Sequence, residues 1–207
     1  MATLLAFSPL FMELISAIIS FIIGYYALKG YRVSSEKGLL LLHFGFVILG
    51  VSMILRVITT FYVIALVREF RSPQPAVAAA LTFASLIYSV AQLIAYGLFT
   101  VNYTRQAKML GQAAIIAPFF LLRYNTYLEL IAVVLLGYVA VQSMINLALK
   151  RNTEAFLVTS GFSFMFLSHL FFLFTIVEEA LYSTGQITQL IGFLCLLVML
   201  TRVSTIK

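Results

Sequence analysis

Long apolar runs separated by short polar segments make up most of this chain. A helix needs about 20 mainly apolar residues to cross the roughly 30 Å hydrocarbon core of a bilayer. Hydrocarbon offers no partners to backbone N–H and C=O groups, so each such run is predicted to be an α-helix. The predicted helices cover residues 9–28, 38–67, 76–103, 127–149, 154–177 and 186–203.

A shorter run, Met109–Leu122, contains Pro118 and leaves the number of spans open. At 1.5 Å per residue it reaches only about 21 Å, so it crosses a locally thinned bilayer or lies flat at the interface. The first alternative gives seven transmembrane helices and the second gives six.

The distribution of basic residues favours seven helices with the N-terminus outside and the C-terminus in the cytoplasm. Six spans divide the loop cations equally between the two sides, whereas seven spans place nine inside and three outside, as the positive-inside rule requires. The nine are Lys29, Arg32, Lys37, Arg105, Lys108, Lys150, Arg151, Arg202 and Lys207, and the three are Arg68, Arg71 and Arg123.

An internal repeat also favours seven helices. QLIAYGLFTVNYTR (92–105) returns 97 positions later as QLIGFLCLLVMLTR (189–202), and the ELI that begins at Glu13 returns 116 positions later at Glu129. At the latter offset Gly45-Phe46 matches Gly161-Phe162 and Ser52 matches Ser168. We expect one all-α membrane domain, residues 1–207. It would contain two parallel three-helix repeats (about 9–105 and 127–203) joined by a linker helix (about 109–123).

The unequal offsets place 19 extra residues between the second and third helices of the first repeat. These residues are mostly apolar and make both helices longer than the hydrocarbon is thick. Steep tilt accommodates such helices. Alternatively, they form an apolar hairpin that docks another membrane chain or a second copy, since large exposed apolar surfaces mark interaction sites.

Composition agrees with a membrane protein, because 63% of residues are hydrophobic and only 10% are charged. The net charge of +6 fits cytoplasmic loops beside anionic headgroups, and no nucleic-acid partner is expected. Cys195 is the single cysteine, so neither a disulfide framework nor a thiolate metal cluster is predicted. The N-terminus lacks the basic region of a signal peptide. No cofactor is expected.

Charged residues inside apolar helices are costly and therefore candidates for function. Glu13 and Arg56 are predicted to pair between the first two helices, either to fix the packing or to bind a solute or proton. Glu129 is the repeat counterpart of Glu13, but Phe172 stands where Arg56 has its counterpart. His169 is the available partner for Glu129, unless it is only a hydrogen-bonded core residue.

A second set of candidates is uncharged. Ser85, Ser89, Gln92 and Tyr96 recur at helical spacing on one face, and Gln189 is the repeat counterpart of Gln92. Such rows either bond helix to helix or line a cavity. Gln92 and Gln189 are the best candidates for a central site between the repeats, which Gln142 and Asn146 extend toward the inner side.

Two further classes of function are disfavoured. Ligation of one haem iron by His43 and His169 requires similar depth, but the repeat alignment separates them by ten positions, about 15 Å along a helix. No nucleophile–base set, zinc-ligand spacing or phosphate loop is apparent, so enzymatic activity is not expected.

Two three-helix units joined by one inverting helix resemble the architecture of the sugar-facilitating SWEET proteins. The proline that marks the first helix of each SWEET unit has no repeat here, since Pro9 lacks a counterpart. YYALKGYR, HFGFVILG and SHLFFLF resemble segments of uncharacterised archaeal membrane proteins. This resemblance implies no activity.

Two functions remain. The first is a non-catalytic sensor or assembly subunit that acts through partner chains, and the second is a facilitator of a small solute with its site between the repeats.

Overall fold

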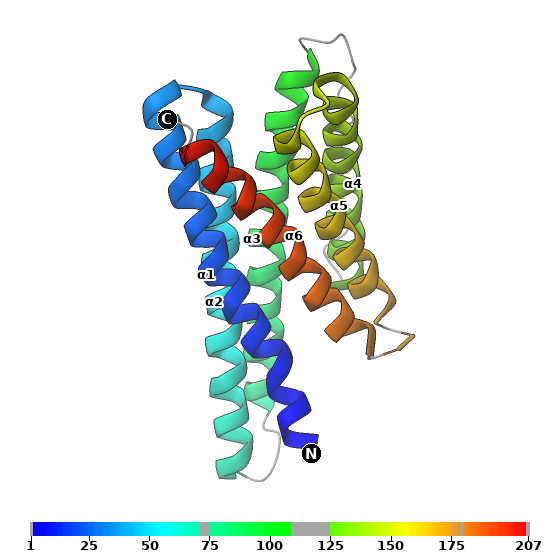
Figure 1. Cartoon of the computed structure of the whole chain (residues 1–207). Coiled ribbons are helices and arrows are strands. Elements are labelled where there is room, and N and C mark those ends of the chain that lie inside the picture. The colour runs from blue at the N-terminus through cyan, green and yellow to red at the C-terminus, as the bar shows by residue number, and fades with distance from the viewer. Residues whose placement is uncertain (1, 71–74, 109–124, 176, 179, 206–207) are drawn as a thin grey trace.

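The computed structural model describes residues 2–70, 75–108, 125–175, 177–178 and 180–205. Their fold is all-helical, as predicted, and all six helices are long and apolar enough to cross a membrane (Figure 1). The helices are α1 (Ala2–Ser34), α2 (Lys37–Phe70), α3 (Pro75–Lys108), α4 (Asn125–Lys150), α5 (Thr153–Phe174) and α6 (Ala180–Thr205). The predicted linker helix, 109–123, lies outside the described residues, so the seven-helix count stays a prediction.

Most helices extend beyond their predicted apolar runs at one or both ends, and α5 ends earlier than predicted. Helix α5 ends at Phe174 instead of Val177. Helix α6 begins at Ala180 instead of near Gln186, because the helix continues through Gly185. A Cβ on Gly185 would lie 2.5 Å from a ring carbon of Phe172, so glycine is what allows the two helices to approach there.

The helices form a closed ring in which each contacts its neighbours in chain order and α6 returns to α1. Helices α1, α3, α4 and α6 run in one direction, and α2 and α5 run in the other (Figure 1). The turn end of the ring carries the α1–α2 and α4–α5 turns at Ser35 and Arg151. The hairpin end carries the end of α2 and the beginnings of α3, α4 and α6.

Apolar side chains cover the outside of the ring, and polar ones lie inside it. On α1 the exposed positions recur every three or four residues at Phe11, Leu14, Ile18, Ile22 and Tyr25. The interior contains the buried polar residues Glu13, Ser16, Ser20, Ser52, Ser89, Gln92, Asn102, Ser143, Thr159, Ser168, His169, Gln186, Thr188 and Gln189. A bilayer solvates the apolar exterior, and polar side chains bond helix to helix inside.

The turns after α1 and α4 have the same conformation. Ser35 and Arg151 are the described non-glycine residues with left-handed backbone, at φ 58° and 47°. Each N–H donates to the carbonyl four residues earlier, on Tyr31 and Leu147, at 2.7 and 2.8 Å. A left-handed residue after the last turn is a common helix ending. The two turns lie 116 positions apart, which is the repeat offset.

Close helix packing also recurs at the repeat offsets. A Cβ on Gly45 would lie 2.3 Å from the Phe99 ring, and a Cβ on Gly161 would lie 2.6 Å from Leu196. Gly161 is 116 positions after Gly45, and Leu196 is 97 after Phe99. The same glycine contact therefore joins α2 to α3 and α5 to α6.

The matched serines behave alike as well. Ser52 donates to the carbonyl of Leu49 at 2.8 Å, and Ser168 donates to that of Met165 at 2.7 Å. Each hydroxyl thus has its hydrogen-bond acceptor within its own helix, so these positions serve helix packing.

Helices α2 and α3, between which the predicted repeat places 19 extra residues, are longer than α5. Each has 34 residues, about 51 Å, whereas α5 has 22 residues, about 33 Å. Figure 1 shows the α2–α3 hairpin reaching beyond the α5–α6 connection at the hairpin end.

Candidate functional site

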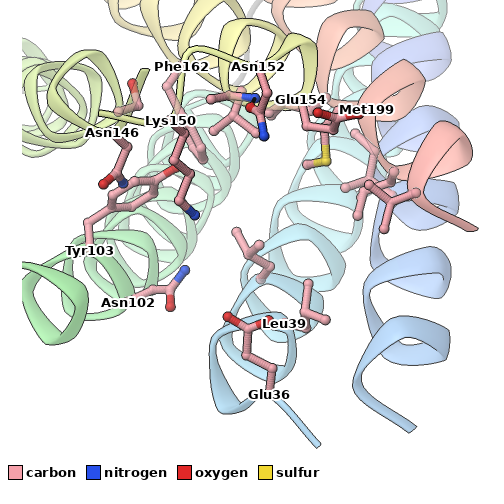
Figure 2. A pocket seen from close by; sticks show the side chains of 18 of the residues that line it. Glu36, Leu39, Asn102, Tyr103, Asn146, Lys150, Asn152, Glu154, Phe162 and Met199 are labelled. Atoms are coloured by element: carbon pink, nitrogen blue, oxygen red, sulfur yellow. Dashed lines mark hydrogen bonds between the residues drawn. The ribbon is translucent and has the colours of Figure 1, made fainter. Parts of the chain in front are cut away.

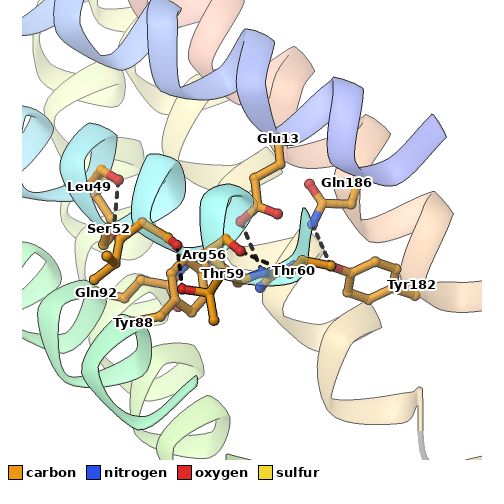
Figure 3. Close-up of polar contacts among 11 residues, drawn as sticks. Glu13, Leu49, Ser52, Arg56, Thr59, Thr60, Tyr88, Gln92, Tyr182 and Gln186 are labelled. Carbon is orange, nitrogen blue, oxygen red and sulfur yellow. Dashed lines mark hydrogen bonds and ion pairs between the residues drawn. The ribbon is translucent and has the colours of Figure 1, made fainter. Parts of the chain in front are cut away.

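An ion pair between Arg56 and Glu13 lies inside the ring of helices, beside the hairpin-end opening. Arg56 Nε on α2 is 3.0 Å from Glu13 Oε1 on α1, and Glu13 is only 1% exposed. The guanidinium lies over the ring of Tyr88, 4.5 Å from its centroid, and donates to the hydroxyl of Tyr182 on α6 (Figure 3). The structure therefore brings the predicted pair together and joins both halves of the chain to it.

A hydrogen-bonded chain of three residues forms the second polar group. His169 on α5 contacts Glu129 Oε2 through Nδ1 and the Tyr96 hydroxyl through Nε2, each at 2.6 Å. For a neutral imidazole, the network assigns the proton to Nδ1, which donates to the carboxylate, while Nε2 accepts from the tyrosine. The chain runs from the partly exposed Glu129 to fully buried Tyr96.

Three buried glutamines surround these two groups. Gln92 Nε2 donates to the Tyr88 hydroxyl at 2.7 Å, and Gln186 Nε2 donates to the Tyr182 hydroxyl at 3.2 Å. Gln189, the third glutamine, is 1% exposed. Besides the Glu13 oxygens, which face Arg56, four buried side-chain atoms of the described residues have no hydrogen-bond partner: Ser16 Oγ, Ser163 Oγ, Gln186 Oε1 and Gln189 Nε2.

A cavity of about 290 Å³ opens beside the ion pair at the hairpin end. Its lining includes Arg56, Tyr88, Glu129 and Tyr182, which come from four different helices. Ser85 and Ser89 of the predicted polar row also line it, together with Thr59, Thr60 and Ala84. We call it the hairpin-end cavity.

A second cavity, of about 330 Å³, opens at the turn end and is lined by residues of all six helices (Figure 2). Lys150, Glu36 and Glu154 supply charges, and Asn102, Asn146 and Asn152 supply amides. Figure 2 shows the side chain of Lys150 reaching into this space. We call it the turn-end cavity.

Aromatic side chains lie inside the ring of helices, between the two cavities. The aromatic layer is a set of rings in contact, and consecutive centroids in it are separated by 5.1–6.3 Å. In order along the axis they are Tyr103, Phe162, Phe99, Tyr96, His169, Phe172 and Tyr182. Tyr103 and Phe162 line the turn-end cavity, and Tyr182 lines the hairpin-end cavity, so the layer extends from one cavity to the other.

The remaining predicted residues lie elsewhere in the ring. Asn146 lines the turn-end cavity, and Gln142 lies partly buried one turn before it on α4. His43 bonds through Nδ1 to the carbonyl of Gly24 at 2.9 Å, so it joins α2 to α1. The described residues contain no group of three His, Cys, Asp or Glu that could hold a metal ion.

Sequence reasoning missed several lining residues. Tyr182 is near the beginning of its helix, where tyrosine is common at membrane interfaces. Lys150 was counted as a loop cation, and Glu36 and Glu154 were not considered, because all three lie at or beside helix ends. Their approach to a common cavity depends on how the helices are arranged around the axis, which periodicity does not specify.

Comparisons with family models, curated proteins and solved structures find no match for this chain.

Proposed function

We propose that this chain is a membrane facilitator that conducts a small solute along the axis of the helix ring. The observation that carries the proposal is the pair of cavities open at opposite ends of one ring, with the aromatic layer extending from one to the other. Such an arrangement is expected of a pathway closed at its centre, where a solute enters from one side and waits for rearrangement of the rings.

The proposal includes two parallel three-helix units, with 109–122 crossing the membrane as the seventh span. Helix α3 ends at the turn end and α4 begins at the hairpin end, which supports a connection across the bilayer. The matched turns at Ser35 and Arg151 and the matched glycine contacts support the duplication.

The turn end faces the cytoplasm in this proposal. Lys29, Arg32, Lys37, Lys150 and Arg151 all belong to helix ends or turns at the turn end, which supports that orientation by the positive-inside rule. The test is labelling with a membrane-impermeant maleimide in a Cys195→Ser background. Glu178→Cys should react from outside and Asn152→Cys only after permeabilisation. Labelling of both cysteine variants from the same side of the membrane overturns the topology.

The two halves meet along the α3–α4 and α6–α1 contacts. Polar bonds across the axis also hold them together, including Arg56 to Tyr182 and Tyr96 to His169. In the facilitator, one half rocks against the other. This movement breaks these few bonds and separates the side chains of the aromatic layer. Gating of one bundle against another around a central site is a general mode of alternating access.

The test is uptake of radiolabelled solutes into proteoliposomes, using glycerol, glucose, acetate, ethylamine and an amino-acid mixture. Phe99→Ala removes a ring from the middle of the aromatic layer and should raise the rate for the transported solute several-fold. Phe174→Ala, an exposed ring on α5, is the matched control and should change nothing. Uptake equal to protein-free liposomes for every solute, in wild type and Phe99→Ala alike, overturns the proposal.

A sensor or assembly subunit is the second candidate, and the length of the hairpin favours it. The apolar span of α2 covers Lys37–Leu66, about 45 Å, against about 30 Å of hydrocarbon. Tyr62 and Phe83 on the hairpin are 60% and 66% exposed. A partner membrane chain would cover such surface beyond the bilayer.

The assembly role is tested by purification from native membranes in a mild detergent. Wild type should carry a stoichiometric partner chain, the double variant Tyr62→Ser/Phe83→Ser should lose it, and Tyr25→Ser on exposed α1 surface should retain it. A lone monomer for wild type eliminates this role, and a homodimer identifies a second copy as the partner.

A further inference from the structure

Each of the two cavities presents charges of both signs. The hairpin-end cavity is lined by Arg56 and Glu129, and the turn-end cavity by Lys150, Glu36 and Glu154. In both, the cation comes from one half of the chain and at least one carboxylate comes from the other. A solute that passes from one cavity to the other therefore meets the same chemistry twice.

Arg56 retains donors for a carboxylate. A guanidinium has five N–H groups in a rigid fork, and the bonds to Glu13 and Tyr182 occupy two of them. Tyr88 packs against its face and holds its orientation. A preorganised arginine at a cavity wall is well suited to bind a carboxylate by two parallel bonds.

Glu129 retains acceptor capacity for an ammonium group. An ionised carboxylate accepts about four hydrogen bonds, and His169 occupies Oε2. Glu129 lines the cavity with a side chain that is 21% exposed, so a solute reaches it from the open side. Glu13 already neutralises Arg56 in part. Among the described residues, Glu129 makes no ion pair with a lysine or arginine, so its carboxylate is open to an ammonium group.

The passage between the cavities carries unpaired polar atoms of both kinds. Gln186 Oε1 and Gln189 Nε2 lie on α6 between Tyr182, in the hairpin-end cavity, and Leu196, in the turn-end cavity. Both side chains are 1% exposed. A solute with an ammonium donor and a carboxylate acceptor would satisfy both, and a buried polar group without a partner is costly.

We propose that the solute is a small zwitterion that carries one ammonium and one carboxylate, as an α-amino acid does. This inference rests on the proposed facilitator function and specifies its substrate class. Arg56 and Lys150 meet the carboxylate end, and Glu129 with Glu36 or Glu154 meets the ammonium end. A solute of single charge leaves one of each pair of site charges unmatched, which costs binding energy when water is displaced.

Cavity size sets the upper limit on the solute. Volumes of about 290 and 330 Å³ lie at the low end of the range of about 300–1,000 Å³ that small-molecule sites occupy. We therefore expect single amino acids to enter, whereas peptides of several residues do not.

The test compares matched solutes in proteoliposomes. One labelled amino-acid mixture is used unmodified, after N-acetylation and after conversion to amides, so that the side chains stay the same while the ammonium or the carboxylate charge is removed. Glucose and glycerol represent neutral solutes. The unmodified mixture should enter at least tenfold faster than any of the others.

Substitutions at both cavities test the residues. Lys150→Gln, Glu36→Gln and Glu129→Gln should each raise the KM for the unmodified mixture about tenfold or more. Arg56→Lys keeps the positive charge but loses the forked guanidinium, and it should raise the KM for the unmodified mixture as well. Arg32→Gln and Glu178→Gln, which are exposed and line neither cavity, should have no effect.

The outcomes separate this inference from the facilitator proposal. Faster entry of the acetylated, amidated or neutral solutes overturns the zwitterion and leaves a facilitator of another class. Entry of the unmodified mixture that none of the four cavity variants alters also overturns it. No entry of any solute overturns both proposals.

Discussion

The two halves of the ring, α1–α3 and α4–α6, share a layout but differ in how their first two helices pack. In the first half the ring of Phe21 on α1 fits against Gly50 on α2, where a Cβ would lie 3.0 Å away. In the second half the ring belongs to Phe166 on α5 and fits against Gly137 on α4, at 3.2 Å. With the predicted repeat offset of 116, Phe21 corresponds to Gly137 and Gly50 corresponds to Phe166. Phenylalanine and glycine have therefore exchanged positions between the two halves. The total side-chain volume at the two helix–helix contacts is thus the same, although the phenylalanine comes from the first helix in one half and from the second helix in the other.

The halves differ more strongly at their buried carboxylates. Glu13 meets a guanidinium, whereas its counterpart Glu129 meets the imidazole of His169. Phe172 occupies the position equivalent to Arg56 and packs against His169 instead. One half therefore carries an ion pair and the other a hydrogen-bonded chain. The two carboxylates therefore give the hairpin-end cavity and its surroundings different chemistry in the two halves.

The largest effect is expected from breaking the ion pair. Arg56→Leu leaves Glu13 buried without a counterion, which should lower the free energy of unfolding by about 3–5 kcal/mol. The double variant Glu13→Leu/Arg56→Leu removes both charges and should recover most of the loss. Thermal unfolding in detergent gives the comparison, and a double variant as unstable as the single one would contradict it.

A smaller loss is expected at the matched glycine contacts. Gly161→Ala introduces a Cβ 2.6 Å from Leu196 and should cost about 1–3 kcal/mol through overpacking. Gly97→Ala is the matched control, because a Cβ there meets nothing within 4 Å. It should be neutral or stabilising, as alanine is the better helix former. Equal effects of the two in a thermal unfolding assay would refute close packing at Gly161.

The exchange of ring and glycine sharpens the comparison. Transplanting the first-half arrangement with Gly137→Phe and Phe166→Gly should be tolerated better than the sum of the single variants predicts. Contacting residues show coupling of about 0.5–3 kcal/mol. A double-mutant cycle by chemical unfolding measures it. Additive effects would show that the two positions do not share one packing site.

The smallest effect is expected at Tyr96, whose repeat counterpart is Phe193. Tyr96→Phe removes the hydroxyl that donates to His169 and should lower stability by about 0.5–1.5 kcal/mol. Tyr138→Phe, at a longer 3.3 Å contact with Thr104, is the control and should cost less. A larger loss at Tyr138 would mean that the chain through His169 contributes little.

Much of the candidate site follows from the scarcity of charge in apolar helices. Glu13 and Arg56 stand out because few residues in the spans are ionisable, and their pairing follows from the cost of burying either alone. His169 and Glu129 follow from the repeat. The involvement of Tyr182 does not, because the chain contains 11 tyrosines and its sequence position does not show that it faces the axis.

The amino-acid sequence by itself determined that this protein is helical and apolar outside, because hydrocarbon leaves the backbone no other way to satisfy its hydrogen bonds. It also predicts an internal repeat that would match residues between the halves. Only the tertiary structure decided that six helices close into a ring, that two cavities open at its ends and that aromatic rings lie between them. Those features depend on the tilt and rotation of each helix, which arise from packing against neighbours.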